Sequence, residues 1–379
     1  MPQLKGHNAE ISHFFRSDSW IEGESIRQLE RVAALPGMFK VAGYPDLHPG
    51  KGGPVGAAML SEGIFYPYLV GSDVGCGMSL FTTDLYTADA KPEKWSKKLK
   101  GLEEPWDGDT VERLNDFGAM AGGFESSLGT IGMGNHFAEI LKVKQVVDES
   151  SFVSCSLQKD VLFILVHSGS RGLGERLLRS HVDAHRDGGL RSGSEEAHQY
   201  LKVHENCIRW ARANRDLIAT RLIWQIAGNA SIRHSGSWCH NSITPLEYEG
   251  RGCFLHRKGA APTDEGEYVV VPGSRGSCTY LVKPHMNQQA NLWSIAHGAG
   301  RKWGRNECEG RLRDKYTAES MKKTKLGSYV ICEDRDLLFE EAPQAYKDID
   351  AVINDMVSFG LIEVIATFTP ILTYKVRTR

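Results

Sequence analysis

The sequence predicts a mixed fold of helices and short strands in one domain. The chain has 379 residues, of which 41% are hydrophobic, and this is enough to bury several apolar clusters. Short apolar runs alternate with amphipathic, helix-like windows along the chain. No low-complexity linker or internal repeat separates them. We therefore expect residues 1–379 to form a single domain.

The first part of the chain predicts one clear helix, two strands and a second helix. Glu22 to Leu35 has apolar residues on one side at helical spacing. Met38 to Ala42 and Ile64 to Val70 are short apolar runs bounded by turn residues, which is typical of strands. Lys91 to Leu102 is expected to form an exposed helix, and the glycine-rich stretch Gly118 to Gly134 a loop.

The second part predicts a buried strand, a long helical region and further strands. Val161 to Val166 is a continuous apolar run of strand length. Gly174 to Gln225 has a helical pattern, and short strands are expected from Ser231 to Val282. We expect a helix to start just after His297 and a last strand over Leu361 to Tyr374.

The charge of the whole chain is close to neutral, but its distribution is uneven. There are 45 basic and 47 acidic residues, a net charge of −2. Residues 171–221 carry ten basic and seven acidic residues, residues 297–326 nine and four, and residues 333–356 two and eight. These segments are either solvated helix faces or a basic groove whose charge an acidic lobe masks in the total.

Neither a targeting signal nor a paired-cysteine motif is visible. The first fifteen residues are polar, and no apolar run reaches about 18 residues, so we expect a cytoplasmic protein. The eight cysteines include no C-x-x-C pair, which argues against a zinc ribbon or a thioredoxin-type site. In a reducing compartment most of them should be buried thiols.

Glycine is unusually frequent, with 40 residues against a typical share of about 7%. Fifteen of these glycines fall in six short clusters, and all of the clusters except residues 129–135 also carry Asp, Cys, His, Lys or Arg. The clusters are residues 49–53, 71–77, 129–135, 167–172, 272–276 and 297–301. Glycine permits close approach of the backbone to a ligand, so these clusters predict loops around a metal or phosphate site.

Five side chains beside these loops are candidate metal ligands. Asp73 and Cys76 lie about one turn apart and could share a metal, or they are a turn aspartate and a buried thiol. His167 ends the strongest predicted strand, and His136 and His240 follow or precede similar polar loops. Each histidine alone could be a satisfied polar group. Together, the N, O and S donors fit a dinuclear Mn²⁺ or Zn²⁺ site better than Mg²⁺.

His297 suggests a different role. It is followed by Gly298, Ala299, Gly300 and Arg301, so backbone amides and a guanidinium could hold phosphate oxygens while the imidazole attacks phosphorus. The alternative is a capping or loop histidine. The chain has no G-x-x-x-x-G-K-[ST] motif, which excludes a P-loop NTPase.

At this point the motifs resemble those of the RtcB family of RNA ligases, in the family's order over about residues 40 to 375. The matching segments are 45–48 (PDLH), 71–78 (GSDVGCGM), 134–139 (GNHFAE), 167–171 (HSGSR), 240–241 (HN), 256–260 (HRKGA), 272–274 (PGS) and 297–301 (HGAGR). The resemblance implies an α+β fold, with packed β-sheets around a dinuclear metal site and surrounding helices.

The resemblance also implies a role for each candidate ligand. Cys76 would bridge two Mn²⁺ ions, Asp73 and His136 would complete one metal site, and His167 and His240 the other. His297 would attack the α-phosphate of GTP and become guanylylated. The implied GTP-binding residues are Asn135, Phe137, Glu139, Lys258, Thr279, Ala299, Gly300, Arg301, Tyr346 and Lys375. The implied RNA contacts are Arg171, Asn135 and Lys258, and Asp46 matches an acidic position whose role is open.

From these residues we expect a GTP- and Mn²⁺-dependent ligase. It would join an RNA 3′-phosphate or 2′,3′-cyclic phosphate to a 5′-hydroxyl in RNA repair or tRNA splicing, as a monomer that an accessory protein assists. The alternative is a metal-dependent phosphodiesterase or phosphatase on RNA ends, and a third reading is an RNA-binding factor with a structural metal.

The sequence departs from the family pattern at a few positions. Ala296 and Gly304 replace common serines, Thr279 replaces a serine that faces the guanine, and Arg275 stands where methionine is frequent. These changes indicate a shorter, divergent branch, while every implied metal ligand and His297 are retained.

Overall fold

The computed structural model describes residues 9–228 and 230–377. The remaining residues of the predicted domain lie outside the described part. The helices are α1 (Gly23–Ala33), α2 (Pro67–Val70), α3 (Pro92–Lys98), α4 (Thr110–Asp116), α5 (Glu149–Ser154), α6 (Gly172–His185), α7 (Glu195–Ala227), α8 (Arg305–Leu312), α9 (Arg335–Glu340) and α10 (Ile349–Ser358).

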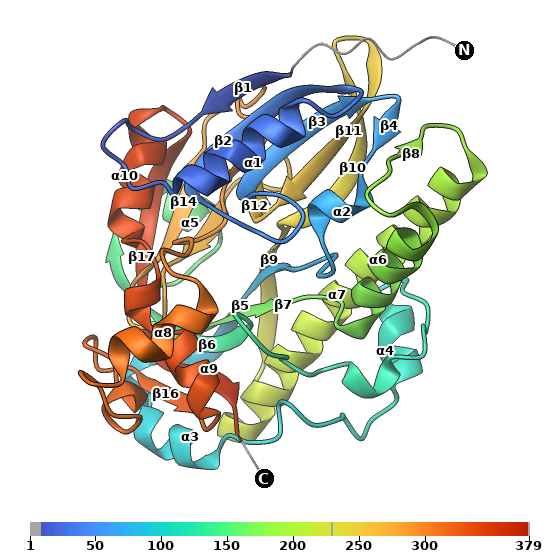
Figure 1. Cartoon of the computed structure of the whole chain (residues 1–379). Helices are drawn as coiled ribbons and strands as arrows, with labels where there is room; N and C mark the ends of the chain where they lie inside the picture. The colour runs from blue at the N-terminus through green and yellow to red at the C-terminus, as the bar shows by residue number, and fades with distance from the viewer. Residues whose placement is uncertain (1–8, 229, 378–379) are drawn as a thin grey trace.

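Two larger sheets form the framework (Figure 1). The five-stranded sheet contains, in spatial order, β1 (Glu10–His13), β2 (Met38–His48), β3 (Val55–Glu62), β11 (Arg251–Lys258) and β10 (Asn241–Tyr248). The eight-stranded sheet contains, in spatial order, β13 (Val269–Pro272), β14 (Thr279–Pro284), β17 (Ile362–Val376), β6 (Phe137–Val146), β7 (Val161–Ser168), β5 (Gly77–Tyr86) and β9 (Ile232–Cys239), with β16 (Tyr329–Cys332) also paired to β17. Two-stranded pairs join β12 (Ala260–Pro262) to β15 (Ser294–Ala296) and β4 (Ile64–Phe65) to β8 (Leu190–Arg191).

The main apolar core lies where the two sheets meet. It brings side chains of β5 and β7 together with side chains of β3 and β11, including Leu80, Phe163, Leu60 and Leu255, all of which are fully buried. Strand β7 is buried along its whole length, as its continuous apolar run predicts. Removing such a side chain from water stabilises the fold by about 1.5–3 kcal/mol each.

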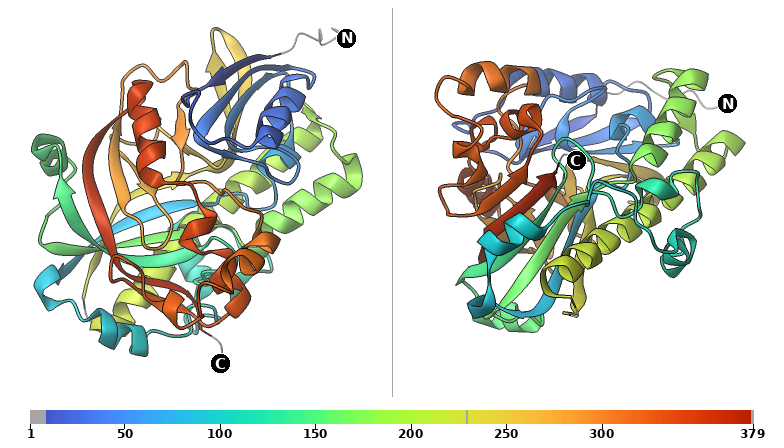
Figure 2. Two further views of the ribbon diagram at one scale, coloured as in Figure 1. Left: turned by 60° about the vertical axis from the view of Figure 1, so that its left-hand side comes forward. Right: turned by 90° about the horizontal axis from the view of Figure 1, so that it is seen from below.

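Helices cover the outer faces of both sheets (Figures 1 and 2). Helix α1 packs on β2, and its apolar face is the one that the sequence predicts. Helix α7 has 33 residues and packs across β5, β7 and β9. It begins at the cap Ser194, whose hydroxyl accepts a hydrogen bond from the amide of Ala197. The predicted mixture of helices and strands is therefore confirmed.

Several predicted elements differ from the structure, and the predicted helical region Gly174 to Gln225 is divided into α6 and α7. Ile64 to Val70 was expected to be one strand, but only Ile64–Phe65 is extended, because Pro67 opens the short helix α2. The helix expected just after His297 begins instead at Arg305. The backbone of Gly300 has a φ of +68° and forms a loop there, which a helix does not allow.

The helix predicted for Lys91 to Leu102 is present only as α3 (Pro92–Lys98), and it is less exposed than expected. Trp95 on this helix and Leu99 and Leu102 after it are buried in a cluster with side chains of β5, β7 and α7. The lysines of this region favour the prediction of an exposed helix, although its apolar side is buried. Among the described residues, no helix combines the length and apolar character that a membrane crossing requires.

Candidate active site

A cavity of about 750 Å³ opens where the two sheets approach the loops after β15. It receives residues from six of the glycine-rich segments and from both sheets. The predicted residues that line it are Asp73, Cys76, Asn135, Phe137, Glu139, His167, His240, Lys258, His297, Ala299, Gly300, Arg301, Tyr346 and Lys375. Residues that lie up to 300 positions apart in the sequence thus share one cavity.

Strand register brings four candidate metal ligands to the same edge of the eight-stranded sheet. In the β5–β7 pair, Gly77 faces Ser168, and in the β5–β9 pair Gly77 faces Cys239. Phe137 faces His167 in the β6–β7 pair. Because each ligand lies within one residue of these pairs, Cys76, His136, His167 and His240 meet at one end of the sheet.

These ligands form a compact cluster around a thiol. The Sγ atom of Cys76 is 3.3 Å from Nε2 of His136 and 3.2 Å from Nε2 of His167. Nε2 of His167 lies 3.3 Å from Nε2 of His240, and Nε2 of His136 lies 2.8 Å from Oδ2 of Asp73. The donor atoms of Cys76, His136 and His167 all lie within 4.8 Å of one another.

The surroundings of the imidazole rings fit a metal centre. Nδ1 of His136 lies 3.1 Å from the carbonyl oxygen of Ile131, and Nδ1 of His167 lies 3.2 Å from that of Asn135. When each Nδ1–H donates to its carbonyl, the Nε2 lone pairs converge on the cluster, which is the usual arrangement of a metal-binding histidine. Burial lowers the pKa of His167 and His240, which keeps both rings neutral.

The thiol and the carboxylate of this cluster complete a donor set of N, O and S atoms. Burial, together with Asp73, raises the pKa of the Cys76 thiol. Burial also opposes ionisation of Asp73, but His136 beside it holds the pKa of this carboxyl below its usual range. Neutral imidazoles and an ionised carboxylate around a thiol suit a divalent cation, which would stabilise the thiolate.

The position of the Asp73 carboxylate requires a residue without a side chain at Gly169. A Cβ atom at Gly169 would lie 2.0 Å from Oδ1 of Asp73, so any side chain there would displace this ligand. A Cβ atom at Gly300 would lie 2.2 Å from the carbonyl oxygen of Asp46. The prediction that glycine clusters provide clearance around the site is consistent with both contacts.

His297 is held by a fully buried carboxylate at the edge of the cluster. Oδ2 of Asp46 accepts hydrogen bonds from Nδ1 of His297 at 2.6 Å and from its backbone amide at 3.1 Å. The centroid of the His297 ring lies 4.6 Å from that of His240. With Nδ1 engaged by Asp46, Nε2 carries the free lone pair of this cavity-lining imidazole.

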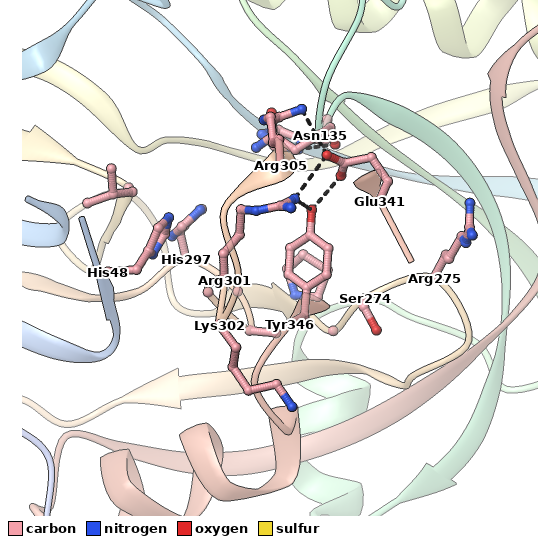
Figure 3. A pocket seen from close by; sticks show the side chains of 18 of the residues that line it. His48, Asn135, Ser274, Arg275, His297, Arg301, Lys302, Arg305, Glu341 and Tyr346 are labelled. Carbon is pink, nitrogen blue, oxygen red and sulfur yellow. Dashed lines mark hydrogen bonds and ion pairs between the residues drawn. The ribbon is translucent and has the colours of Figure 1, made fainter. Parts of the chain in front are cut away.

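The opposite part of the cavity contains a network around Glu341 (Figure 3). Its carboxylate accepts hydrogen bonds from Tyr346 and from Nη1 of Arg301 at 3.1 Å, and forms ion pairs with Arg305 at 2.9 Å and Lys375 at 3.7 Å. Burial opposes its charge, but Lys375, Arg305 and Arg301 lower the pKa of Glu341 to about 2. An ionised carboxylate therefore organises four side chains, three of which were predicted to contact GTP.

A second carboxyl group in the cavity has a pKa close to neutral pH. Burial raises the pKa of Glu139 to about 7, while Thr373, which donates a 2.6 Å hydrogen bond to it, and Lys375 oppose this effect. Two carboxyl groups in one cavity thus have different charge states. Such separation is typical of functional sites.

Some predicted residues lie beside the cavity rather than in its wall. His136 is buried behind Cys76, and Nη1 of Arg171 lies 3.4 Å from Nδ1 of His136. Thr279 is buried in β14 opposite Phe368 of β17, and Asp46 acts from behind His297. Lys258 reaches the cavity, where its Nζ also donates to the carbonyl oxygen of Val70 at 2.5 Å.

The sequence reasoning missed several residues of the cavity. His48, Arg275, Arg305 and Glu341 all line it. Glu341 lies in the acidic segment 333–356, where it is indistinguishable from solvated acids. His48 and Arg275, in contrast, directly follow or belong to recognised motifs, and this position is a signal that could have identified them.

Comparison with known proteins agrees with this geometry. A family profile described as "tRNA-splicing ligase RtcB" matches residues 28–113 and 115–376. An "RNA-splicing ligase RtcB2" from Escherichia coli is 45% identical over 358 residues, which cover 94% of this chain and 93% of the relative. An "RNA-splicing ligase RtcB" from Escherichia coli K12 is 26% identical, with 94% and 95% covered. A "tRNA-splicing ligase RtcB" from Thermococcus kodakarensis is 26% identical, with 92% and 90% covered.

Proposed function

We propose, because the chain belongs to the RtcB family of RNA ligases, that it joins an RNA 3′-phosphate or 2′,3′-cyclic phosphate to a 5′-hydroxyl at the expense of GTP. The observation that carries the proposal is the pairing of His297 with the buried Asp46 beside the histidine–cysteine cluster. This pairing directs a nucleophilic nitrogen into a cavity that also holds cations and hydrogen-bonding groups. A phosphodiesterase or phosphatase would not need this histidine.

In the first step, Nε2 of His297 attacks the α-phosphorus of GTP. A P–N bond forms, the bond between the α-phosphorus and its bridging oxygen breaks, and pyrophosphate leaves. Asp46 stabilises the positive charge that develops on the imidazole, because its carboxylate accepts the Nδ1 hydrogen bond. The side chains of Asn135, Lys258 and Arg301 and the backbone at Ala299 and Gly300 line the cavity and would hold phosphate oxygens.

In the later steps, an oxygen of the RNA 3′-phosphate attacks the phosphorus of histidine-bound GMP, and His297 leaves. The 5′-hydroxyl oxygen of the second RNA end then attacks the RNA 3′-phosphorus, and GMP leaves. Two Mn²⁺ ions, held by Asp73, Cys76, His136, His167 and His240, would neutralise phosphate charge in this chemistry.

The part of the cavity around Glu139 is suited to the guanine base. Phe137, Tyr346, Lys375 and Glu139 line it together, with two aromatic faces, a cation and a carboxyl group. Thr279 and Arg171 lie just outside the wall, and we assign Thr279 to the guanine and Arg171 to the RNA end. We place the reaction in the cytoplasm, in a monomer that an accessory protein assists.

Incubation with [α-³²P]GTP and Mn²⁺ tests the first step. Wild-type protein should become labelled, and His297→Ala should lose the label by several orders of magnitude, because the variant lacks the nitrogen that forms the P–N bond in this proposal. His285→Ala is a suitable control, since its half-exposed side chain lies outside the cavity. A label that persists in His297→Ala would contradict the assignment of the nucleophile. A wild type that labels but does not seal nicked RNA with 3′-phosphate and 5′-hydroxyl ends would contradict the ligase activity.

A further inference from the structure

We propose that two tryptophans at the mouth of the cavity, Trp20 and Trp303, stack against the terminal base of the RNA that is being joined. Together with Lys302 and Arg311 they form what we call the tryptophan rim, and all four residues line the cavity. The inference rests on the proposed function and identifies how the same site holds its RNA substrate. None of the family motifs described above includes Trp20, Trp303 or Arg311.

Trp20 has the environment of a binding residue. Its side chain is 49% exposed, although it is one of the largest apolar side chains of the protein, and it belongs to none of the apolar clusters of the described residues. Its ring lies 5.6 Å from Nζ of Lys347. A tryptophan that is half exposed at the mouth of a cavity contributes little to folding and leaves an apolar face available for a ligand.

The loop that carries Trp20 is anchored, so the ring is presented in a defined place. Nε of Arg16 donates to Oδ1 of Asp355 at 2.7 Å, and the hydroxyl of Ser19 donates to the other oxygen of this carboxylate. Asp355 belongs to α10 and is buried. Because the residues that precede Trp20 are fixed to this helix, less conformational entropy is lost when a base binds.

Trp303 lies along the same edge and is flanked by cations. The Cζ atom of Arg311 is 5.1 Å from its ring centroid, and Nζ of Lys302 is 6.0 Å from it. The amides of Lys302 and Trp303 donate to the carbonyl oxygen of Ala345 at 2.7 and 3.4 Å. Lys347, which contacts Trp20, is two residues further along the same segment, so residues 345–347 connect the two tryptophans.

Aromatic faces between cations are the usual means of holding unpaired nucleic acid. Bases stack on the rings, and the cations neutralise the backbone phosphates. Three of the four rim residues, Lys302, Trp303 and Arg311, belong to residues 297–326, which have a net charge of +5. The guanine of GTP is already assigned to the part of the wall that Phe137, Glu139 and Lys375 line. The base at the rim is therefore that of the RNA.

The test compares three tryptophan variants on an RNA with a 3′-phosphate and an RNA with a 5′-hydroxyl. Trp20→Ala should raise the KM for one of these RNAs by about tenfold, because a base–aromatic stack is lost. Trp20→Phe should recover most of the loss. Trp224→Ala is the matched control: Trp224 is 52% exposed on α7 but lies outside the cavity, so its KM should stay as in the wild type.

An abasic nucleotide identifies the stacked base. Wild-type protein should bind RNA with an abasic terminal nucleotide about as weakly as Trp20→Ala binds intact RNA. Trp20→Ala should bind the abasic RNA no more weakly than it binds intact RNA, because the same stack is already lost. Abasic sites at the 3′ and the 5′ terminus, in separate RNAs, distinguish the two ends.

Two results would overturn the inference. One is an unchanged RNA KM in Trp20→Ala. The other is that the affinity losses from Trp20→Ala and from the abasic nucleotide add fully at both RNA ends. This would indicate that the ring contacts something other than a terminal base, such as a partner protein. Labelling with [α-³²P]GTP, measured in parallel, reports on the proposed function separately. A wild type without label would contradict that function, whereas a labelled Trp20→Ala with normal RNA KM would contradict only the stacking.

Discussion

At the scale of single residues, burial sets the charge state of the groups that face the cavity. Glu341 and Glu139 are both almost completely buried, yet the pKa of the first is lowered to about 2 and that of the second raised to about 7. The difference arises because three cations surround Glu341, while Glu139 has Thr373 and only Lys375 to offset its burial. One carboxylate therefore organises side chains, and the other can change its charge near neutral pH.

The pKa of Glu139 predicts a pH dependence of GTP binding. The donor groups of guanine require an ionised carboxylate as acceptor, and a raised pKa means that this form is present above about pH 7 and is lost as the pH falls below it. We expect the KM for GTP in the labelling reaction to rise about tenfold from pH 8 to pH 6. Glu139→Gln should have a higher KM that does not depend on pH in this range. An equally steep profile in this variant would show that another group titrates.

Single residues of the site are also the feature that the sequence predicts most completely. Motifs predicted Asp73, Cys76 and the histidines as candidate ligands, because these residue types beside glycine-rich loops are typical of a metal site. Glu341 could not be identified in this way. An acidic residue in an acidic segment is usually solvated, and only the approach of Arg301, Arg305 and Lys375 from other parts of the chain makes it a buried anion.

At the scale of elements, helix α7 supports the loops that carry the candidate metal ligands. Arg215 on this helix is fully buried, and its Nη1 donates to the carbonyl oxygens of Gly75 and Ser168, both at 2.9 Å. These residues precede Cys76 and follow His167. Asn214 donates to the hydroxyl of Ser168 at 3.0 Å. One turn of a helix thus holds two ligand loops in register.

Arg215→Met is therefore expected to destabilise the protein. The variant keeps much of the side-chain volume but leaves two buried carbonyl groups without their donor, at a cost of about 3 kcal/mol. Urea unfolding of the metal-free protein measures this loss as a lower midpoint. Arg209→Met on the same helix is the control: its side chain is 48% exposed and pairs with Glu205, so the change should be at most about 0.5 kcal/mol. Similar midpoints for both variants would show that Arg215 does not support the loops.

At the scale of the whole molecule, the cavity exists because two sheets and several loops converge. A bound cation should therefore stabilise the entire fold. At a Mn²⁺ concentration about a hundred times the dissociation constant, the gain is about 2.7 kcal/mol. For a chain of 379 residues this corresponds to a rise in Tm of about 3 °C.

Thermal unfolding with and without Mn²⁺ measures this coupling. The rise in Tm should be much smaller in Cys76→Ala, which lacks the central sulfur of the cluster. Cys207→Ala is a matched control, because its thiol is also fully buried but lies on α7 within an apolar cluster. It should have a lower Tm and the same rise on addition of Mn²⁺. An equal rise in Cys76→Ala would mean that the cluster is not where the metal binds.

The net charge of the whole molecule does not describe how its basic and acidic segments are arranged in the fold. The net charge of −2 averages over a basic segment at the cavity mouth and an acidic segment that was expected to form a separate lobe. Part of that acidic segment, Glu341, instead lies inside the cavity and pairs with Arg301 and Arg305 of the basic one. Composition alone therefore could not indicate an RNA substrate.

The sequence by itself determined the candidate groups of the site. The candidate ligand types, the glycine-rich loops and the histidine before Gly298 are local patterns. The apolar spacing that predicts helix α1 and strand β7 is also local and does not depend on distant residues. Only the tertiary structure decided which groups meet. The register of β5 with β7 and β9 brings Cys76, His167 and His240 together, and the packing of β15 on β2 places Asp46 beside His297. The physical reason is that propensity and spacing act over a few residues, whereas contact across hundreds of residues depends on how sheets pair and pack.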